Sequence, residues 1–300
     1  MPELPDVVIY VDSLLRYLVG QPLVAVRLSS PFVLRSVDPP IQELEGKTVQ
    51  AVRRLGKRIV FGFGDEFFLV VHLMIAGRFR WRRRNQKIPK KLGLAAFDFP
   101  RGTLLLTEAG TKKRASIHVV RGDDNLLQHD PGGIEVVGCA LEAFREALTR
   151  ENHTLKRALT DPRLFSGIGN AYSDEILHAA RLSPLKRTNQ LTDDEVSRLH
   201  EQTLATLEEW TRQIRDEVGS GFPEKVTAFR EGMAAHGRFR QPCPVCGAPI
   251  QRIVFAENET NYCARCQTGG KMLADRALSR LLKGDWPKTL DAWENPKGTL

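Results

Sequence analysis

The sequence predicts an α+β protein of several domains: an N-terminal helix with an antiparallel β-sheet domain, a helical domain and a C-terminal four-cysteine finger. Short β-branched and aromatic runs extend from Pro22 to about Val120, and the pattern becomes helical after 131–133. Four of the five cysteines lie within 24 residues near the C-terminus. With 300 residues, 42% of them apolar, the chain can bury a sizeable core, which excludes a disordered tail or a small disulfide scaffold.

The first domain is expected over residues 1–130. A helix is predicted over 5–19, because apolar residues recur there at helical spacing between a proline and a glycine that suit its two ends. The runs 57–63 and 67–74, joined by Gly64-Asp65, predict a hairpin. Together with the neighbouring runs they favour an antiparallel sandwich or barrel.

A helical domain is expected over 131–241. The segment G-I-G-N at 167–170 separates two stretches of helical spacing, which predicts a glycine-rich turn with Asn170 as N-cap of the second helix. Amide groups at such a turn suit a phosphate, although many helix pairs use glycines only to turn. A capping box at Thr192 and Glu195 predicts one further helix.

The four clustered cysteines predict a zinc finger. They stand in two pairs sixteen residues apart: Cys243 and Cys246, then Cys263 and Cys266. Two such pairs surround one Zn²⁺ ion with thiolates and leave no position for water, so the predicted ion is structural. The residues between the pairs predict a β-hairpin, which can contact nucleic acid or protein. We expect the finger over 242–271 and a C-terminal tail over 272–300, loosely ordered from 285 onward.

The net charge of +8 favours a polyanionic partner. Basic and acidic residues number 21 and 13 in 1–130, but 23 and 23 in 131–300, so the whole surplus lies in the first domain. Eight basic residues and no acidic one fall within 78–91, which fits either a DNA-contacting surface or a solvated loop. No apolar run approaches the roughly 18 residues of a membrane span and the start lacks a signal-peptide pattern, so we expect a cytoplasmic protein without a membrane partner.

The extreme N-terminus carries an unusual pair of residues. If Met1 is removed, Pro2 becomes a free secondary amine beside the carboxylate of Glu3. Such an amine forms an iminium ion with a sugar carbonyl, and a neighbouring carboxylate can relay protons. The alternative is an ordinary N-terminus in which both residues only start a helix.

Six motifs follow one another along the chain. They are M-P-E-L-P-D-V at the start, L-G-K at 55–57, H-L at 72–73, G-I-G-N-x-Y-x-D-E at 167–175, H-G-R at 236–238 and the four cysteines. In this order they resemble the formamidopyrimidine-DNA glycosylase and endonuclease VIII family over residues 1 to about 267. The resemblance implies a helix and β-sandwich domain that faces a helix-two turns-helix domain and zinc finger across a DNA-binding cleft. It further implies a nucleoid-associated monomer that acts on damaged DNA as a bifunctional DNA glycosylase and AP lyase, with one structural Zn²⁺ and no organic cofactor.

The resemblance also implies roles for individual residues. Pro2 attacks C1′ of the damaged nucleotide, Glu3 is the general acid and base, and β,δ-elimination then cuts the strand. Lys57, grouped here with the catalytic residues, and Asn170 match positions that hold phosphates beside the lesion. The remaining expected DNA contacts are His72, Lys156, Tyr172 and Asn258. Simpler interpretations stay open: Lys57 as a sheet-edge charge, Asn170 as a helix cap and His72 as a satisfied core histidine.

Three departures from the family pattern bear on the substrate. Ile75 stands where the family has a Met that fills the hole left by the flipped base, and 107–117 replaces the loop with an Arg and Phe wedge. Asn258 replaces a phosphate-gripping Arg at the hairpin tip. Because unstacking costs least when a base is unpaired, we expect a preference for single-stranded, mispaired or opened DNA. The alternatives are an inactive DNA-binding protein of the same fold and, less well supported, a zinc-ribbon adaptor.

Overall fold

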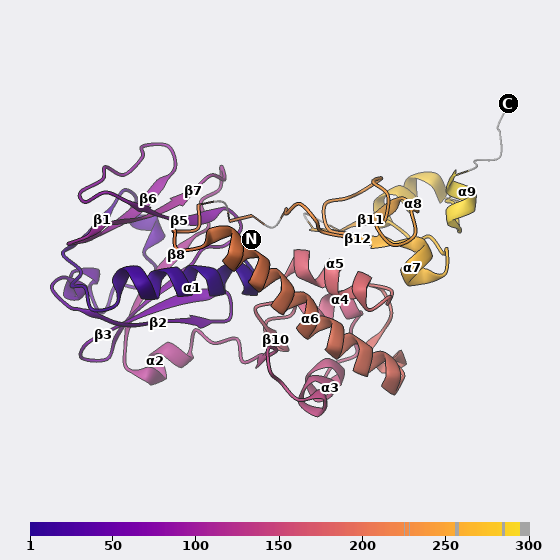
Figure 1. The fold of residues 1–300 in the computed structure, drawn as a ribbon, viewed down its shortest axis with the longest axis horizontal. Coiled ribbons are helices and arrows are strands. Elements are labelled where there is room, and N and C mark those ends of the chain that lie inside the picture. Colours follow the sequence, from indigo (N-terminus) through magenta and orange to yellow (C-terminus); the bar gives the residue numbers. More distant parts are fainter. Residues whose placement is uncertain (225, 228, 256–257, 284–285, 295–300) are drawn as a thin grey trace. The chain divides into compact units, whose positions relative to one another are not determined.

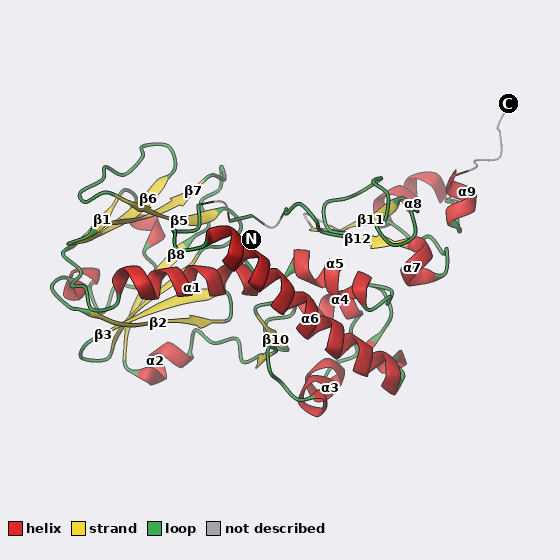
Figure 2. Ribbon diagram, in the orientation of Figure 1, coloured by secondary structure: helices red, strands yellow, loops and turns green. Residues whose placement is uncertain are grey.

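The structure is a computed structural model that describes residues 1–224, 226–227, 229–255, 258–283 and 286–294. The chain forms two compact units (Figure 1). The first comprises Met1–Gly132 and Glu209–Ala228, and the second comprises Gly133–Glu208 and Phe229–Leu300. Figure 2 shows that the first unit consists mainly of strands and that the second is richer in helices.

Helix α1 (Leu4–Leu18) opens the first unit. It begins and ends one residue earlier than expected, because Glu3 is the N-cap and its backbone N–H donates to the Asp6 carboxylate at 3.0 Å, one half of a capping box. Leu14 and Leu18 on its apolar face are fully buried in the core of this unit. Complete burial of a leucine side chain contributes about 1.5–3 kcal/mol to stability.

Two antiparallel four-stranded sheets make up most of the first unit. In spatial order, one sheet contains β1 (Ala25–Leu28), β6 (Gly93–Phe99), β7 (Gly102–Glu108) and β5 (Gly77–Arg82). The other contains β2 (Val49–Leu55), β3 (Arg58–Phe63), β4 (Phe67–His72) and β8 (Ser116–Arg121). Buried side chains of both sheets and of α1 form one core cluster, so the expected α+β fold with an antiparallel sandwich is confirmed.

The predicted hairpin is strands β3 and β4. Its connection is Gly64–Glu66, one residue longer than expected, and Asp65 and Glu66 both have positive φ angles of 58°. Strand β4 ends at His72, so Leu73 and Met74 lie outside it. The unit also contains α2 (Asp123–Leu127) and two short 3-10 helices, η1 (Pro31–Val33) and η2 (Ile41–Leu44).

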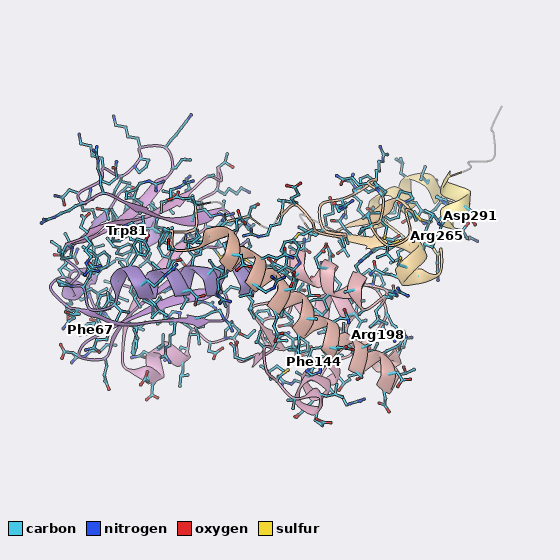
Figure 3. The ribbon with its side chains drawn as sticks, viewed as in Figure 1. Phe67, Trp81, Phe144, Arg198, Arg265 and Asp291 are labelled. Atoms are coloured by element: carbon cyan, nitrogen blue, oxygen red, sulfur yellow. The ribbon has the colours of Figure 1, made fainter. Side chains whose placement is uncertain are left out.

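Helices dominate the second unit up to residue 208. Its elements in chain order are β9 (Ile134–Glu135), α3 (Leu141–Thr149), α4 (Leu155–Thr160), β10 (Phe165–Ser166), α5 (Asn170–Ala179), η3 (Thr188–Gln190) and α6 (Asp193–Val218). Phe144, labelled in Figure 3, is fully buried and its ring centroid lies 4.9 Å from that of Phe165. No described helix is both long and apolar enough to cross a membrane.

The predicted capping box starts α6. The Thr192 backbone N–H donates to the Glu195 carboxylate at 3.0 Å, and the Glu195 N–H donates to the Thr192 hydroxyl at 3.3 Å. The last turns of α6, from Glu209, belong to the first unit, where Arg215 pairs with Asp12 at 2.8 Å.

The C-terminal part of the second unit contains the expected finger hairpin. Its elements are β11 (Ile250–Phe255), β12 (Asn258–Cys263), α7 (Ala264–Thr268), α8 (Arg276–Leu282) and α9 (Leu290–Glu294). The segment expected to be a loose tail includes α9, whose Leu290 is buried and donates its N–H to the Gly270 carbonyl at 2.8 Å. Residues 284–285 and 295–300 of that tail lie outside the described residues.

Candidate functional site

The first candidate group lies at the start of α1. Pro2 is buried and Glu3 retains only 1% of its surface, at a helix N-terminus where the dipole attracts negative charge. The Glu3 carbonyl accepts the Val7 N–H at 2.9 Å, so the backbone here is fixed by the helix that follows. The adjacent residues Pro2 and Glu3 are therefore held in a defined position.

Four charged side chains act on the amino group of Met1. Burial lowers the pKa of this amine below its usual 8.0; Arg78 and Lys57 lower it further, whereas Glu3 and Asp6 raise it. A lowered pKa leaves more of this Met1 amine neutral at pH 7. The Met1 amine, Glu3 and Lys57 are thus close enough to interact electrostatically.

Lys57 is placed by a tight turn between β2 and β3. Gly56 occupies the first central position with a φ of +61°, and Leu55 pairs with Arg58 across the turn. Positive φ at this position is the geometry of a type II′ hairpin turn, which glycine adopts without strain. Lys57 therefore stands at the end of a hairpin, half-buried beside the N-terminus.

His72 lies at the end of β4, paired in register with Arg58 on one side and Ser116 on the other. Its Nε2 atom is buried and has no hydrogen-bond partner among the described residues, so the interpretation as a satisfied core histidine is wrong. Burial, followed by the charges of Arg58 and Lys57, lowers its pKa to about 4. His72 is therefore neutral at pH 7, with a buried ring nitrogen that bonds to no described group.

Two connections of the first unit contain residues that depart from the family pattern. Between β4 and β5, Ile75 is 54% exposed. The following Gly77 has no room for a side chain, because a Cβ would come within 2.1 Å of the Leu73 carbonyl oxygen. The connection between β7 and β8 exposes Lys112, Lys113 and Arg114.

The connection from β7 to β8 is fixed by a buried acid. Both carboxylate oxygens of Glu108 accept the N–H of Arg114, at 2.9 and 3.1 Å, and one accepts the N–H of Ala115 at 3.1 Å. These hydrogen bonds to Glu108, at the end of β7, fix the backbone that carries the basic residues of this connection.

In the second unit, Asn170 is the first residue of α5 rather than its N-cap. Gly169 takes the N-cap position with an extended backbone, φ −136° and ψ −155°, and the predicted cap was therefore wrong by one residue. The Asn170 amide Nδ2 donates to the Glu259 carbonyl of β12 at 2.8 Å. Asn170 thus joins the glycine-rich turn to the finger hairpin.

Two further polar residues of α5 bind the finger module at helical spacing. Asp174, four residues after Asn170, accepts the Asn261 N–H at 3.2 Å. His178, four residues later still, has its Nε2 atom 3.2 Å from the Cys243 sulfur. Because residues at i, i+4 and i+8 share one helix face, α5 presents a polar stripe to this module.

Asp174 is also the centre of a buried ionic cluster. Its two carboxylate oxygens lie 2.5 Å from Lys156 Nζ and 2.8 Å from His236 Nδ1, and Lys156 donates further to the Asn170 carbonyl at 2.7 Å. Asp174 has no exposed surface, whereas 12% of the Lys156 side chain is exposed. Both contacts occupy the ammonium group of Lys156, so in this structure it orients the glycine-rich turn.

Tyr172 and Asn258 differ sharply in exposure. Tyr172 has 1% of its surface exposed, so its ring offers a DNA strand no contact in this structure. Asn258 is exposed at the first residue of β12, opposite Phe255. Asn258 can therefore meet a ligand directly, whereas Tyr172 belongs to the helical core.

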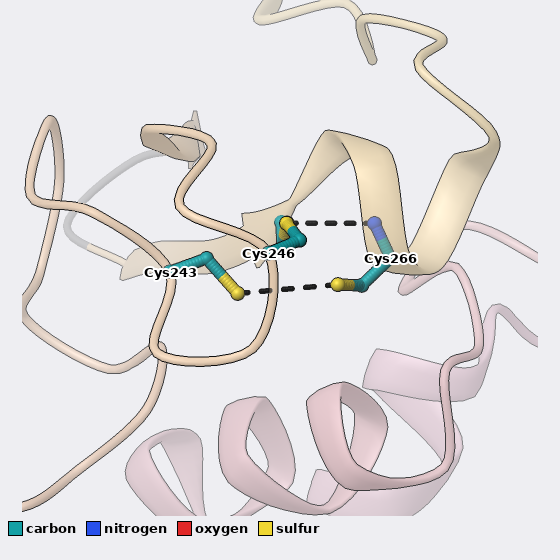
Figure 4. A group of neighbouring side chains, drawn as sticks. Cys243, Cys246 and Cys266 are labelled. Carbon is teal, nitrogen blue, oxygen red and sulfur yellow. Dashed lines mark hydrogen bonds between the residues drawn. The ribbon is translucent and has the colours of Figure 1, made fainter.

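The four cysteine sulfurs lie within 4.8 Å of one another. Cys243 faces Cys266 at 3.9 Å (Figure 4), and Cys246 faces Cys263 at 3.4 Å. Tetrahedral Zn–S bonds of about 2.3 Å place sulfurs about 3.8 Å apart, so this donor set fits one Zn²⁺ ion. His178 contacts the Cys243 sulfur from outside the group, in the position of an outer-shell partner.

Asp174, His178 and His236 were not predicted from the sequence as site residues. A signal for the first two was present, because Asn170, Asp174 and His178 recur every four residues on a helix that was itself predicted. Polar residues at that spacing indicate a polar surface opposite the helix. The partner of that surface is distant in sequence, so the pattern alone does not identify it.

Three family models match the chain. They are described as the formamidopyrimidine-DNA glycosylase N-terminal domain over residues 1–112, the H2TH domain of that enzyme over 136–218 and a zinc finger found in FPG and IleRS over 240–269. The zinc-finger match and the sulfur geometry together confirm the expected structural Zn²⁺.

One curated relative matches most of the chain, and another matches less than half of it. A formamidopyrimidine-DNA glycosylase from Lactococcus lactis subsp. cremoris is 30% identical over 279 residues, which cover 89% of this chain and 99% of the relative. An uncharacterized formamidopyrimidine-DNA glycosylase-like protein from Mycobacterium tuberculosis is 43% identical over 129 residues, covering 43% of this chain and 80% of the relative.

Solved structures of DNA complexes share the fold. MutM bound to DNA containing carbocyclic 8-oxo-G has a TM-score of 0.77 and 26% identity, covering 89% of this chain and all of the other. The Lactococcus lactis Fpg complex with abasic-site DNA has a TM-score of 0.77 and 27% identity, with coverage of 89% and 99%. The chain therefore belongs to the formamidopyrimidine-DNA glycosylase family of DNA-repair glycosylases.

Proposed function

We propose that this protein is a bifunctional DNA glycosylase and AP lyase whose nucleophile is the nitrogen of Pro2, released by removal of Met1. The observation that carries the proposal is the position of the chain start, where buried Pro2 and Glu3 precede α1 and the N-terminal amine interacts with Lys57. The same residues stand at the start of the first family match.

The proposed reaction begins when the Pro2 nitrogen attacks C1′ of the damaged nucleotide. The C1′–N bond to the base breaks and the base leaves with a proton. The C1′–O4′ bond then breaks, O4′ takes up the proton lost from the Pro2 nitrogen, and an iminium ion joins Pro2 to the opened sugar. Loss of a proton from C2′ then eliminates the 3′ phosphate, and loss of a proton from C4′ eliminates the 5′ phosphate. Water finally hydrolyses the iminium, which releases the sugar fragment and frees Pro2. We assign the proton transfers to Glu3, which adjoins the nucleophile.

The residues predicted from the sequence to contact DNA have different proposed roles. Lys57 and His72 lie close together, one cationic and one neutral, and suit a phosphate or its neighbouring sugar. Asn170 and Lys156 act as positioning residues that fix the glycine-rich turn, whose amides suit a phosphate. Exposed Asn258 contacts the strand directly, and Tyr172 contributes to the core. We further propose that the protein works as a monomer.

Borohydride trapping tests the catalytic proposal. Mass spectrometry first establishes that Met1 is absent, and the protein is then mixed with an abasic oligonucleotide and sodium borohydride. We expect a covalent adduct with the wild type, little adduct with Glu3→Gln, and a strong reduction with Pro2→Gly. Pro5→Ala, which alters the other proline of this start, is the matched control and should keep the adduct. No adduct from correctly processed wild type would leave DNA binding without lyase chemistry as the function.

We also propose that the enzyme prefers single-stranded or opened DNA. Ile75 and the exposed residues Lys112–Arg114 stand in place of the Met and the Arg-Phe wedge that, in the family pattern, fill the space left by a flipped base. A duplex then bears an unstacking cost of a few kcal/mol that a single strand avoids. The test compares cleavage rates of one lesion in both forms. Equal or faster cleavage in the perfect duplex would falsify this preference.

A further inference from the structure

The basic segment 78–91 divides into two parts with different surroundings. Its first part lies in β5, where Arg78, Arg80 and Arg82 alternate with Phe79 and Trp81. Phe79 is fully buried in the sandwich core, and Trp81 packs against that core. The three arginines therefore share the other face of an edge strand.

The three arginines of β5 are occupied within the first unit. Arg82 forms a bidentate ion pair with Glu224, with nitrogen–oxygen distances of 2.6 and 3.0 Å, and Arg80 reaches the same carboxylate at 3.2 Å. Arg78 donates to the Val226 carbonyl and to the Gly77 carbonyl, the latter at 2.6 Å. Part of the charge that the sequence offers to a polyanion is thus used to hold the segment after α6.

The second part, residues 83–91, is a folded loop. The Gln86 carbonyl accepts from the Arg27 guanidinium at 2.8 Å, and the Gln86 N–H donates to the Thr103 hydroxyl at 3.3 Å. The Gly93 N–H donates to the Pro89 carbonyl at 2.8 Å, and Ile88 packs so closely on Gly93 that a Cβ there would lie 2.2 Å from its methyl group. Three anchors on the sandwich therefore hold the loop.

The basic side chains of this loop are exposed. They are Arg83, Arg84, Lys87, Lys90 and Lys91. Arg84 acts electrostatically on Asp98, which is itself bonded to Arg27. Among the described residues, the other four have no carboxylate within ion-pair distance, in contrast to the arginines of β5. We call these five residues the basic loop.

We propose that the basic loop is a second phosphate-binding site that contacts duplex DNA several nucleotides away from the lesion; this rests on the proposed function in DNA repair. Arg78 acts on the N-terminal amine, so the start of β5 marks the reaction centre. Six residues of strand then span about 17 Å to Arg82, where the loop begins. At about 3.4 Å per nucleotide, a DNA strand that follows β5 from the reaction centre reaches the loop after about five nucleotides.

Phosphate contacts by flexible lysines bring affinity without base specificity. The loop therefore serves recognition of DNA in general, while the groups beside Pro2 select the damaged nucleotide. An acidic protein surface is the alternative partner that such a loop could bind. We favour DNA because the chain belongs to a family of DNA glycosylases and its charge surplus lies in this unit.

The test measures how DNA affinity depends on salt and on DNA length. The loop variant is Lys87→Gln with Lys90→Gln and Lys91→Gln. The control variant removes the same charge from exposed residues in or beside the other sheet: Arg35→Gln, Arg53→Gln and Arg121→Gln. Each protein is titrated against two abasic-site duplexes, one ending three base pairs from the lesion on both sides and one extending fifteen.

On the long duplex, we expect the loop variant to lower the slope of log K against log salt by up to about 2.7, since each lost phosphate contact removes about 0.9. On the short duplex the slopes of wild type and loop variant should agree, and the control variant should match wild type on both. Equal losses on both duplexes, or an equal loss in the control variant, would overturn the proposal. Unchanged long-duplex binding would also overturn it and would favour an acidic protein as the occupant.

The DNA-binding test of the basic loop is independent of the test of the proposed catalytic chemistry. Borohydride trapping on the short duplex reports on Pro2 without involving the loop. A protein that binds with the predicted length dependence but gives no adduct supports the basic loop and contradicts the lyase. The reverse result contradicts the basic loop alone.

Discussion

The two units fix their candidate site residues by different physical means. In the first unit, Glu3 and Lys57 are positioned by a helix start and a hairpin turn that rest on a continuous apolar core. In the second unit, Asn170 and Lys156 are positioned by buried charges and by a module built around metal-binding cysteines. Apolar packing tolerates the loss of single polar groups, whereas a buried ionic cluster does not. The second unit should therefore be the more sensitive to single polar changes and to metal removal.

Zinc removal should cause the largest loss of stability, and it should affect the second unit but not the first. Structural zinc supplies about 10–16 kcal/mol of folding free energy to small finger modules, so chelation should unfold 242–271 and release the Asn170 contact to Glu259. The sandwich core contains no metal-binding cysteine and should persist. Hydrogen exchange after treatment with a zinc chelator measures both regions. Unchanged protection in β11 and β12 would contradict the assigned role of the ion.

Asp174→Ala should give the next largest loss. Removing this carboxylate leaves Lys156 and His236 without their shared partner, and breaking a buried pair costs about 3–5 kcal/mol. Chemical denaturation measures the difference. The matched control is Asp12→Ala, which removes a carboxylate from the half-exposed pair with Arg215 in the first unit, and should cost about 0–1 kcal/mol. Similar losses in the two variants would refute the contrast between the units.

The sequence predicts local features well and partners that are distant along the chain poorly. Alternating and helical spacing predict β3, β4 and α6, since each pattern follows from the neighbours along the chain. The zinc ligands are predicted because the required geometry is encoded in their spacing. The partner of Asn170 is 89 residues away and that of Lys156 is 18 residues away, across a turn. Such pairs depend on how elements pack, which spacing does not specify.

The same limit applies to the basic segment 78–91. The charge run is real, but three of its arginines meet Glu224 or Val226, about 145 residues later in the chain. The alternation of the arginines with Phe79 and Trp81 predicts that they share one face of a strand. It does not predict which segment packs on that face, because that depends on the tertiary structure. A count of charges therefore overestimates how much of the tract is available to DNA.

A pH titration should reveal the unpaired His72 of the first unit. Its pKa falls from 6.5 to about 4 on folding, so the folded state disfavours the protonated form. Stability is thus fully present above pH 6.5, declines as pH falls toward 4, and is lower by about 3 kcal/mol at the end of that range, at 1.36 kcal/mol per pKa unit. Denaturation of wild type and His72→Gln at pH 7 and pH 4.5 measures this. The variant should lose less stability on acidification, and an identical loss would show that His72 is not its source.

His178→Phe should give the smallest effect of this series, and it asks whether the polar stripe of α5 supports the metal as well as the hairpin. The His178 Nε2 atom lies 3.2 Å from Cys243, and outer-shell partners of this kind change metal affinity by about 10–100-fold. Zinc transfer to a chromogenic chelator should be faster by a factor in that range. His200→Phe is the matched control, because His200 also contacts a cysteine sulfur, at 3.7 Å, but Cys139 is not a zinc ligand. Equal zinc release from both variants would mean that His178 only fills space beside the finger, whereas selective release from His178→Phe would join the helical stripe and the metal into one cooperative element.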